Sequence, residues 1–161
     1  MSATNSLHYQ LCCEGAKYII QPRAKDYWTP YIWSTVELVC LGCELADVWA
    51  TNREKSCVIE VKTSHQDFLN DKKKYCRSHQ AEVCGQQMGN FRYYLCPEGI
   101  IKEEELPEGW GLLYWNGKKV TKIKQSMEFQ TNKEYDYLAL CSIFERELGR
   151  HKVFNYRKEF E

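Results

Sequence analysis

The chain has 161 residues, 43% of them hydrophobic and 14% aromatic, and its formal net charge is zero. This length and composition predict one folded domain spanning residues 1–161, and they argue against disorder and against DNA binding through overall positive charge. No stretch approaches the roughly 20 apolar residues of a membrane helix and no signal-peptide pattern opens the chain, so we expect no membrane partner.

The first predicted element is a helix over residues 6–20. Leu7, Leu11 and Tyr18 fall on one stripe at helical spacing, which predicts the face that packs on the core. Glu14 falls on the same stripe. Two interpretations are open: a carboxylate at the edge of the stripe that reaches water, or a carboxylate directed into a functional site.

Two strands are predicted next, over residues 31–40 and 44–51, after a loop that contains two prolines. Each strand carries an acidic residue. Glu37 alternates with apolar residues in the first strand, and Asp47 lies in the second. By its place in the alternation, Glu37 fits a solvated strand face, and a second interpretation comes from the family resemblance described below.

The next predicted strand, over residues 57–64, alternates between apolar and charged residues, so Glu60 and Lys62 point to the same face. A carboxylate and an ammonium are costly to bury without partners. One solution is a buried ion pair between Glu60 and Lys62, since buried charges are usually paired. The other is a divalent cation beside Asp47 and Glu60, because Mg²⁺ is held by one or two carboxylates together with substrate phosphates.

A helix over residues 65–79 follows, and Ser64 begins it with the spacing of a capping box. Lys72 recurs with apolar residues at helical spacing, so it is predicted to face the sheet near the end of the strand that carries Glu60. We interpret Lys72 as a phosphate contact or as a cation that stabilises the site.

The second half of the chain is predicted to complete a mixed sheet of about four or five strands. The elements expected there are a loop, a strand, a hairpin with a lysine-rich second strand and a last helix, over residues 80–90, 91–96, 111–124 and 133–149. Gln86 in the loop and Arg92 in the strand are candidates for contacts with a nucleic acid, since amide and guanidinium groups bind phosphates and bases.

Two short motifs carry a family resemblance. Ala46-Asp47 followed by Glu60-Val61-Lys62 resembles motifs II and III of the PD-(D/E)xK nuclease superfamily. The longer strings EVKTSHQDFLNDKK, GNFRYYLCPEGII and LPEGWGLLYW resemble the MmcB-like DNA-repair proteins and their phage and bacterial relatives. The resemblance covers residues 7–148, and it departs at Ala46, where the name of the superfamily has Pro.

The resemblance implies an α/β fold with a restriction-endonuclease-like core, in which helices flank a central mixed β-sheet. It also implies a Mg²⁺- or Mn²⁺-dependent DNA endonuclease that hydrolyses phosphodiester bonds in DNA repair, recombination or phage DNA processing. DNA is therefore the implied partner, and a homodimer is allowed, since many such nucleases pair to cut both strands.

Site residues follow from the same resemblance. The residues that it assigns to the catalytic centre are Asp47, Glu60, Lys62, Glu37 and Glu14. The metal ligands that it implies are Asp47, Glu60 and the backbone carbonyl of Val61. Lys62 would orient the attacking water or stabilise the charge that develops on the phosphate. The sequence pattern, rather than the resemblance, adds Lys72, Arg92 and Gln86 as contacts with the substrate.

Two alternatives stay open. Some members of the superfamily only bind, so the chain fits a DNA-binding or accessory module with little activity. The nine cysteines are an odd number, which is typical of a reduced, cytoplasmic protein rather than a disulfide scaffold. A structural zinc site is the second alternative, and its ligands would come from Cys40, Cys43, Cys76, His79 and Cys84.

Overall fold

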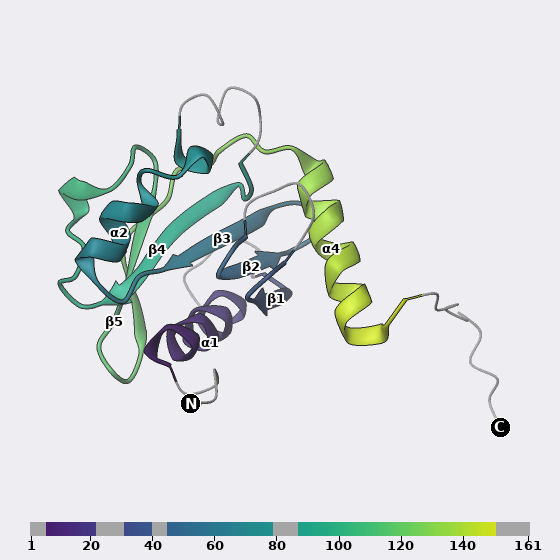
Figure 1. The fold of residues 1–161 in the computed structure, drawn as a ribbon, viewed down its shortest axis with the longest axis horizontal. Coiled ribbons are helices and arrows are strands. Elements are labelled where there is room, and N and C mark those ends of the chain that lie inside the picture. Colours follow the sequence, from purple (N-terminus) through teal and green to yellow (C-terminus); the bar gives the residue numbers. More distant parts are fainter. Residues whose placement is uncertain (1–5, 22–30, 40–44, 79–86, 151–161) are drawn as a thin grey trace.

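A six-stranded mixed sheet organises the computed structural model, which describes residues 6–21, 31–39, 45–78 and 87–150 (Figure 1). Helices lie on both of its faces. The fold is therefore α/β, as predicted, with one strand more than expected. The elements in chain order are α1 (Leu7–Ile20), β1 (Trp33–Val36), β2 (Val48–Thr51), β3 (Ser56–Val61), α2 (His65–Asp71), η2 (Tyr75–Arg77), β4 (Phe91–Pro97), η3 (Glu103–Glu105), β5 (Gly111–Trp115), β6 (Val120–Lys124) and α4 (Lys133–Leu148).

Neighbouring strands of the sheet follow one another in chain order, from β1 to β6. Strand β2 is antiparallel to both of its neighbours, β1 and β3, whereas β3, β4 and β5 are parallel, and β6 returns antiparallel to β5. A parallel pair needs a crossover, and α2 lies in the one between β3 and β4. Val48 pairs with Ile59, so Asp47 and Glu60 meet where β2 begins and β3 ends.

Helix α1 covers one face of the sheet. The Ser6 side chain caps it by accepting a hydrogen bond from the Tyr9 amide at 3.2 Å. Its buried residues, Leu11, Cys12 and Gly15, pack on the apolar face of the strands. A Cβ atom at Gly15 would lie only 2.9 Å from Leu95 Cδ2, so this glycine lets α1 approach the sheet closely.

Helices α2 and α4 cover the opposite face. Phe68 of α2 packs edge-on against Tyr94, and Tyr94 stacks on Trp110 with ring centroids 4.6 Å apart. Ala139 of α4 packs with Trp49 and other buried residues of the sheet. Glu60 lies on this second face, between the parts of the sheet that the two helices cover. Within the described ranges, no helix has the length and apolarity needed to cross a membrane.

The prediction of one helix over residues 65–79 is wrong for the second half of that range. Helix α2 ends at Asp71, and only a short 3₁₀ turn over residues 75–77 follows. In a continuous helix Arg77 would lie about 240° around the axis from Asp71, too far to contact it. Because the helix ends early, Arg77 Nε reaches back to within 2.8 Å of Asp71 Oδ2. The strands predicted over residues 31–40 and 44–51 are also shorter, since β1 ends at Val36 and β2 begins at Val48.

Candidate active site

Glu60 and Lys62 lie side by side at the end of β3, on the face that the alternation predicted. Their side chains are 2% and 4% exposed, and Lys62 Nζ is 3.2 Å from Glu60 Oε2. The buried ion pair considered from the sequence is therefore present. It is one part of a larger charged group.

Asp71, Arg77 and Tyr94 extend this pair into a buried network. Asp71 Oδ1 lies 3.2 Å from Lys62 Nζ, and Asp71 Oδ2 accepts a hydrogen bond from the Tyr94 hydroxyl at 2.8 Å. Arg77 Nη2 is 3.2 Å from Glu60 Oε2, while its Nε binds Asp71. Both cations thus contact both carboxylates, which fixes the position of the Lys62 ammonium.

The second oxygen of Glu60 differs from the first. Glu60 Oε1 is buried and has no hydrogen-bond partner in the described part of the chain. Burial, followed by the charge of Asp47, raises the pKa of Glu60 to about 8, although Lys62 acts in the opposite direction. An unpartnered carboxylate oxygen in a buried position is costly, and a proton or a cation would satisfy it.

Asp47 stands directly before β2, at the edge of this site. Its Oδ2 accepts a hydrogen bond from the Val61 amide at 2.8 Å, which ties the start of β2 to the end of β3. The charge of Asp47 raises the pKa of both Glu60 and Lys62, so the three groups share one electrostatic environment. The structure therefore brings together the three charged residues of the motifs.

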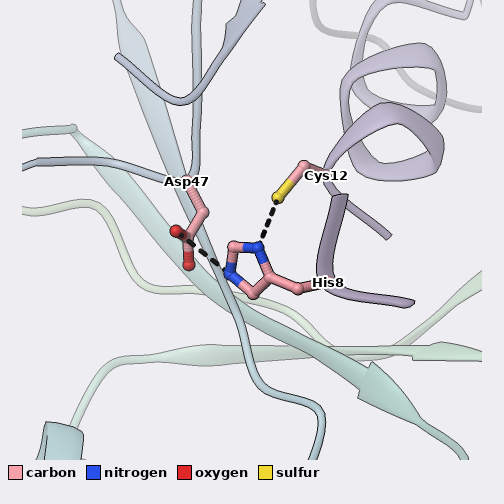
Figure 2. Close-up of side chains that lie close together, drawn as sticks. All are labelled: His8, Cys12 and Asp47. Atoms are coloured by element: carbon pink, nitrogen blue, oxygen red, sulfur yellow. Dashed lines mark hydrogen bonds and ion pairs between the residues drawn. The ribbon is translucent and has the colours of Figure 1, made fainter. Parts of the chain in front are cut away.

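The other oxygen of Asp47 faces helix α1 (Figure 2). His8 Nε2 lies 3.3 Å from Asp47 Oδ1, and Cys12 Sγ lies 3.7 Å from His8 Nδ1. One ligand atom from each of these three residues lies within 4.8 Å of the others. Burial first, then the charges of Asp47 and Glu37, raise the pKa of Cys12 to about 12. The cluster combines nitrogen, sulfur and oxygen donors.

Glu14 and Glu37 were the two further acidic candidates. Glu14 Oε1 pairs with Lys17 Nζ at 2.9 Å, and its carboxylate is half-buried, whereas Leu11, Cys12 and Gly15 of α1 are buried. This position fits the first interpretation, a carboxylate at the edge of the stripe that reaches water.

Glu37 is exposed and follows β1 in a left-handed conformation, with φ of 49°. Its amide donates to the Asp47 carbonyl at 2.9 Å, so its backbone is adjacent to the site. Val61, the third implied metal ligand, lies at the end of β3, where its amide binds Asp47.

Three residues were predicted to contact the substrate. Lys72 is exposed at the end of α2, where its Nζ donates to the Glu105 carbonyl at 2.9 Å. It does not face the sheet, because α2 ends at Asp71 and the inward position belongs to that carboxylate. Gln86 lies outside the described residues.

Arg92 is 2% exposed, which differs from the surface position that a phosphate contact needs. Its Nε donates to the carbonyls of Met88 and Gly89 at 2.9 and 3.1 Å, and its guanidinium lies 4.1 Å from the Phe129 ring centroid. Arg92 therefore holds the chain that leads into β4.

Most ligands of the alternative zinc site, namely Cys40, Cys43, His79 and Cys84, lie outside the described residues. Cys76 is half-buried and not in a disulfide.

Sequence reasoning missed four residues of the site: His8, Cys12, Asp71 and Arg77. His8 and Cys12 have the i, i+4 spacing that places two side chains on one helix face, which is a visible but common signal. Asp71 has helical spacing from Phe68, so its inward position was predictable. The position of Arg77 was not, because it depends on where α2 ends.

Comparisons with known proteins bear on the fold. No protein-family model matches the chain, and no curated protein matches it. The solved structure of a protein of unknown function from Silicibacter pomeroyi is similar, with 20% sequence identity and a TM-score of 0.50. The similarity covers 76% of this chain and 85% of that chain. This likeness supports the mixed α/β sheet and extends over most of both chains.

Proposed function

We propose that this protein is a Mg²⁺- or Mn²⁺-dependent DNA endonuclease that hydrolyses phosphodiester bonds, acting in DNA repair, recombination or phage DNA processing. One observation carries the proposal: buried Glu60 presents an oxygen without a hydrogen-bond partner in the described chain, beside the Lys62 ammonium and across from Asp47. A carboxylate with one oxygen held by cations and one left open is suited to a metal ion.

The donor set fits a hard divalent cation. Asp47 and Glu60 supply carboxylate oxygens from neighbouring strands, and Mg²⁺ is held by one or two carboxylates plus substrate phosphates. Burial and the charge of Asp47 raise the pKa of Glu60 and so favour a proton on it, and a bound cation would take the place of that proton. A bound ion of this kind lowers the pKa of its water and neutralises the charge of the scissile phosphate.

Lys62 has the geometry for a charge-stabilising role. Burial alone would lower the pKa of its ammonium, but Glu60 and Asp71 raise the pKa above its ordinary value. The group therefore stays protonated, and its two carboxylate contacts hold it in place. A positioned cation beside a phosphate stabilises the oxyanion that forms in the transition state.

The order of elements supports the restriction-endonuclease-like core that the resemblance implies. Helix α1, the antiparallel strands β1 to β3, helix α2 and the parallel strand β4 follow one another in the chain. This arrangement places Asp47 at the start of the second strand and Glu60 near the end of the third. DNA is the proposed substrate because the longer strings of the resemblance belong to DNA-repair proteins.

A cleavage assay tests the proposal. Purified protein is incubated with supercoiled plasmid and with branched DNA, in Mg²⁺, in Mn²⁺ and with a chelator. We expect nicking with either metal, none with the chelator, and a loss on the order of 100-fold or more in Glu60→Gln, which keeps the shape but not the charge.

Asp67→Asn is the matched control. Asp67 lies in the first turn of α2 and contributes to the raised pKa of Lys62, but it is half-buried outside the network. This variant keeps wild-type cleavage if the carboxylate of Glu60 is specifically required. Full activity in Glu60→Gln, or equal losses in both variants, would contradict the proposed role.

A second candidate function is a DNA-binding or accessory module with the same fold. Its support is that Glu60 Oε2 already has two cationic partners, since Lys62 Nζ and Arg77 Nη2 each lie 3.2 Å away. Such pairing is sufficient to hold buried charges without a metal. DNA binding that survives chelation, with no nicking under any metal, would favour this module over the nuclease.

A further inference from the structure

We propose that His8, Cys12 and Asp47 form a binding site for Zn²⁺, distinct from the Mg²⁺ or Mn²⁺ centre but sharing Asp47 with it (Figure 2). The two sites would use the two different oxygen atoms of the Asp47 carboxylate. Its Oδ2 lies against the Val61 amide at the end of β3, and its Oδ1 faces His8.

Helix geometry places the first two ligands. His8 and Cys12 are separated by four residues in α1, so both side chains leave the same face of the helix. That face points to the start of β2, where Asp47 lies. Gly15, one turn after Cys12, allows the close approach of α1 to the sheet that brings the three residues together.

The His8 ring lies between the other two residues, with Nε2 toward Asp47 and Nδ1 toward Cys12, so the ring must turn for one of its nitrogens to share an ion with both. Ligand bonds of about 2.0–2.3 Å in a tetrahedral site place the ligand atoms roughly 3.3–3.6 Å apart. His8 Nε2 and Asp47 Oδ1 are already 3.3 Å apart, and one ligand atom of each residue lies within 4.8 Å of the others. The His8 side chain is 38% exposed, so the cluster is open to solvent on this side and an ion would enter there.

The donor types select the metal. An imidazole, a thiolate and a carboxylate are the ligands of Zn²⁺, whereas Mg²⁺ takes oxygen ligands. Three protein ligands leave a fourth position for water or a phosphate oxygen. The cluster therefore suits a borderline-soft cation, while Glu60 on the other side of Asp47 suits a hard one.

Sharing Asp47 has a consequence that rests on the proposed function. Zinc at His8 and Cys12 would draw Asp47 Oδ1 toward α1 and withdraw charge from the neighbourhood of Glu60. Zn²⁺ would then inhibit the Mg²⁺-dependent reaction. An inhibitory zinc site of this kind would make the enzyme respond to the zinc level of its surroundings.

Metal binding by itself tests the site without any need for cleavage. Purified full-length chain is titrated with Zn²⁺ by calorimetry and with Co²⁺ by absorption, where a thiolate ligand gives a sulfur-to-metal charge-transfer band. We expect one ion per chain at this site, with affinity at least 10–100-fold weaker in Cys12→Ala, because removing a ligand costs no less than removing its supporting contacts.

Cys13→Ala is the matched control, since Cys13 is adjacent in α1 and is not part of the cluster. Cys40→Ala and Cys43→Ala report on a zinc site elsewhere in the chain. Loss of the charge-transfer band in Cys12→Ala and in His8→Ala, with the band kept in the three controls, supports the site. Unchanged binding in a folded Cys12→Ala protein overturns it, as does loss only in the Cys40 and Cys43 variants.

The inhibition arm uses the cleavage assay. Micromolar Zn²⁺ should slow cleavage by the wild type and by Cys13→Ala, and have at least tenfold less effect on Cys12→Ala. Zinc that occupies the site without slowing an active enzyme overturns the shared use of Asp47. If no metal supports cleavage, the proposed nuclease fails while the binding titration still decides the zinc site.

Discussion

The Val61 amide donates a hydrogen bond to Asp47 Oδ2 at 2.8 Å, so the carboxylate that precedes β2 is held by the last residue of β3. This contact gives Asp47 a structural role besides any role as a ligand. The same hydrogen bond leaves Asp47 Oδ1 directed at His8. The two roles can be separated by substitutions that keep or remove the acceptor.

Asp47→Asn keeps an oxygen acceptor for the Val61 amide but removes the negative charge. We expect its free energy of unfolding to stay close to the wild-type value, while metal-dependent cleavage falls on the order of 100-fold or more. Asp47→Ala removes both the acceptor and the charge. The Val61 amide is then buried without a partner, which should lower the free energy of unfolding by about 1–3 kcal/mol. Urea unfolding and plasmid nicking measure the two effects, and an Asn variant that cleaves normally would contradict the ligand role.

The raised pKa of Glu60 predicts how stability depends on pH. Burial and the charge of Asp47 raise it from 4.5 to about 8, so the folded chain binds this proton more tightly than the unfolded chain. The stability that the proton contributes is fully present below about pH 4.5 and is lost as the pH rises through about 8. In chelated buffer, this part of the unfolding free energy should therefore decrease between pH 5 and pH 8.

Glu60→Gln isolates that contribution, because the amide stays neutral at every pH. The variant and the wild type should have similar unfolding free energies near pH 5, and the variant should be the more stable of the two near pH 8. Titrating groups that do not interact with Glu60 cancel in this difference. A difference that does not change with pH, measured by urea unfolding at several pH values, would show that the carboxyl is not protonated in the folded chain.

Tyr94→Phe tests the buried network by removing the hydroxyl that binds Asp71. The Tyr94 hydroxyl is buried and donates to Asp71 Oδ2 at 2.8 Å, so its removal leaves a buried carboxylate with one partner fewer. We expect a loss of about 1–3 kcal/mol in the free energy of unfolding. Tyr137→Phe is the control, since Tyr137 is 66% exposed and should change stability by less than about 0.5 kcal/mol. Equal effects in the two variants would argue against the network.

Arg92→Lys distinguishes two roles of Arg92: holding the chain before β4, and contacting the substrate. A lysine has no N–H group at the position of Nε, from which Arg92 donates to the carbonyls of both Met88 and Gly89, so stability should fall by about 1–3 kcal/mol. DNA affinity of the folded variant should be unchanged, because the guanidinium is buried. Weaker DNA binding in a variant of full stability would instead restore Arg92 as a phosphate contact.

Alternation and turn chemistry predicted the sheet and the orientation of its charged residues. Glu60 and Lys62 share a face because side chains alternate along a strand, and Ile59 and Val61, which alternate with them, pack in the core on the opposite face. The α/β fold with a central mixed sheet is confirmed. The helix over residues 6–20 and the last helix are found within one residue of the predicted bounds.

Tertiary contacts decided what the sequence pattern could not. The inward position in α2 belongs to Asp71 rather than Lys72, because Lys62, directly after β3, and Tyr94 of β4 bind the carboxylate. Arg77 joins the same group only because the helix ends early. The contact of His8 with Asp47 links residues from different elements, and no local spacing reports it.

Gly15 has an effect beyond its own packing. It sets the height at which α1 rests on Leu95, and His8 and Cys12 depend on that height to reach Asp47. A side chain added at residue 15 would push α1 away from the sheet and would move His8 and Cys12 away from Asp47. A residue that carries no functional group would thus govern whether the metal cluster can assemble.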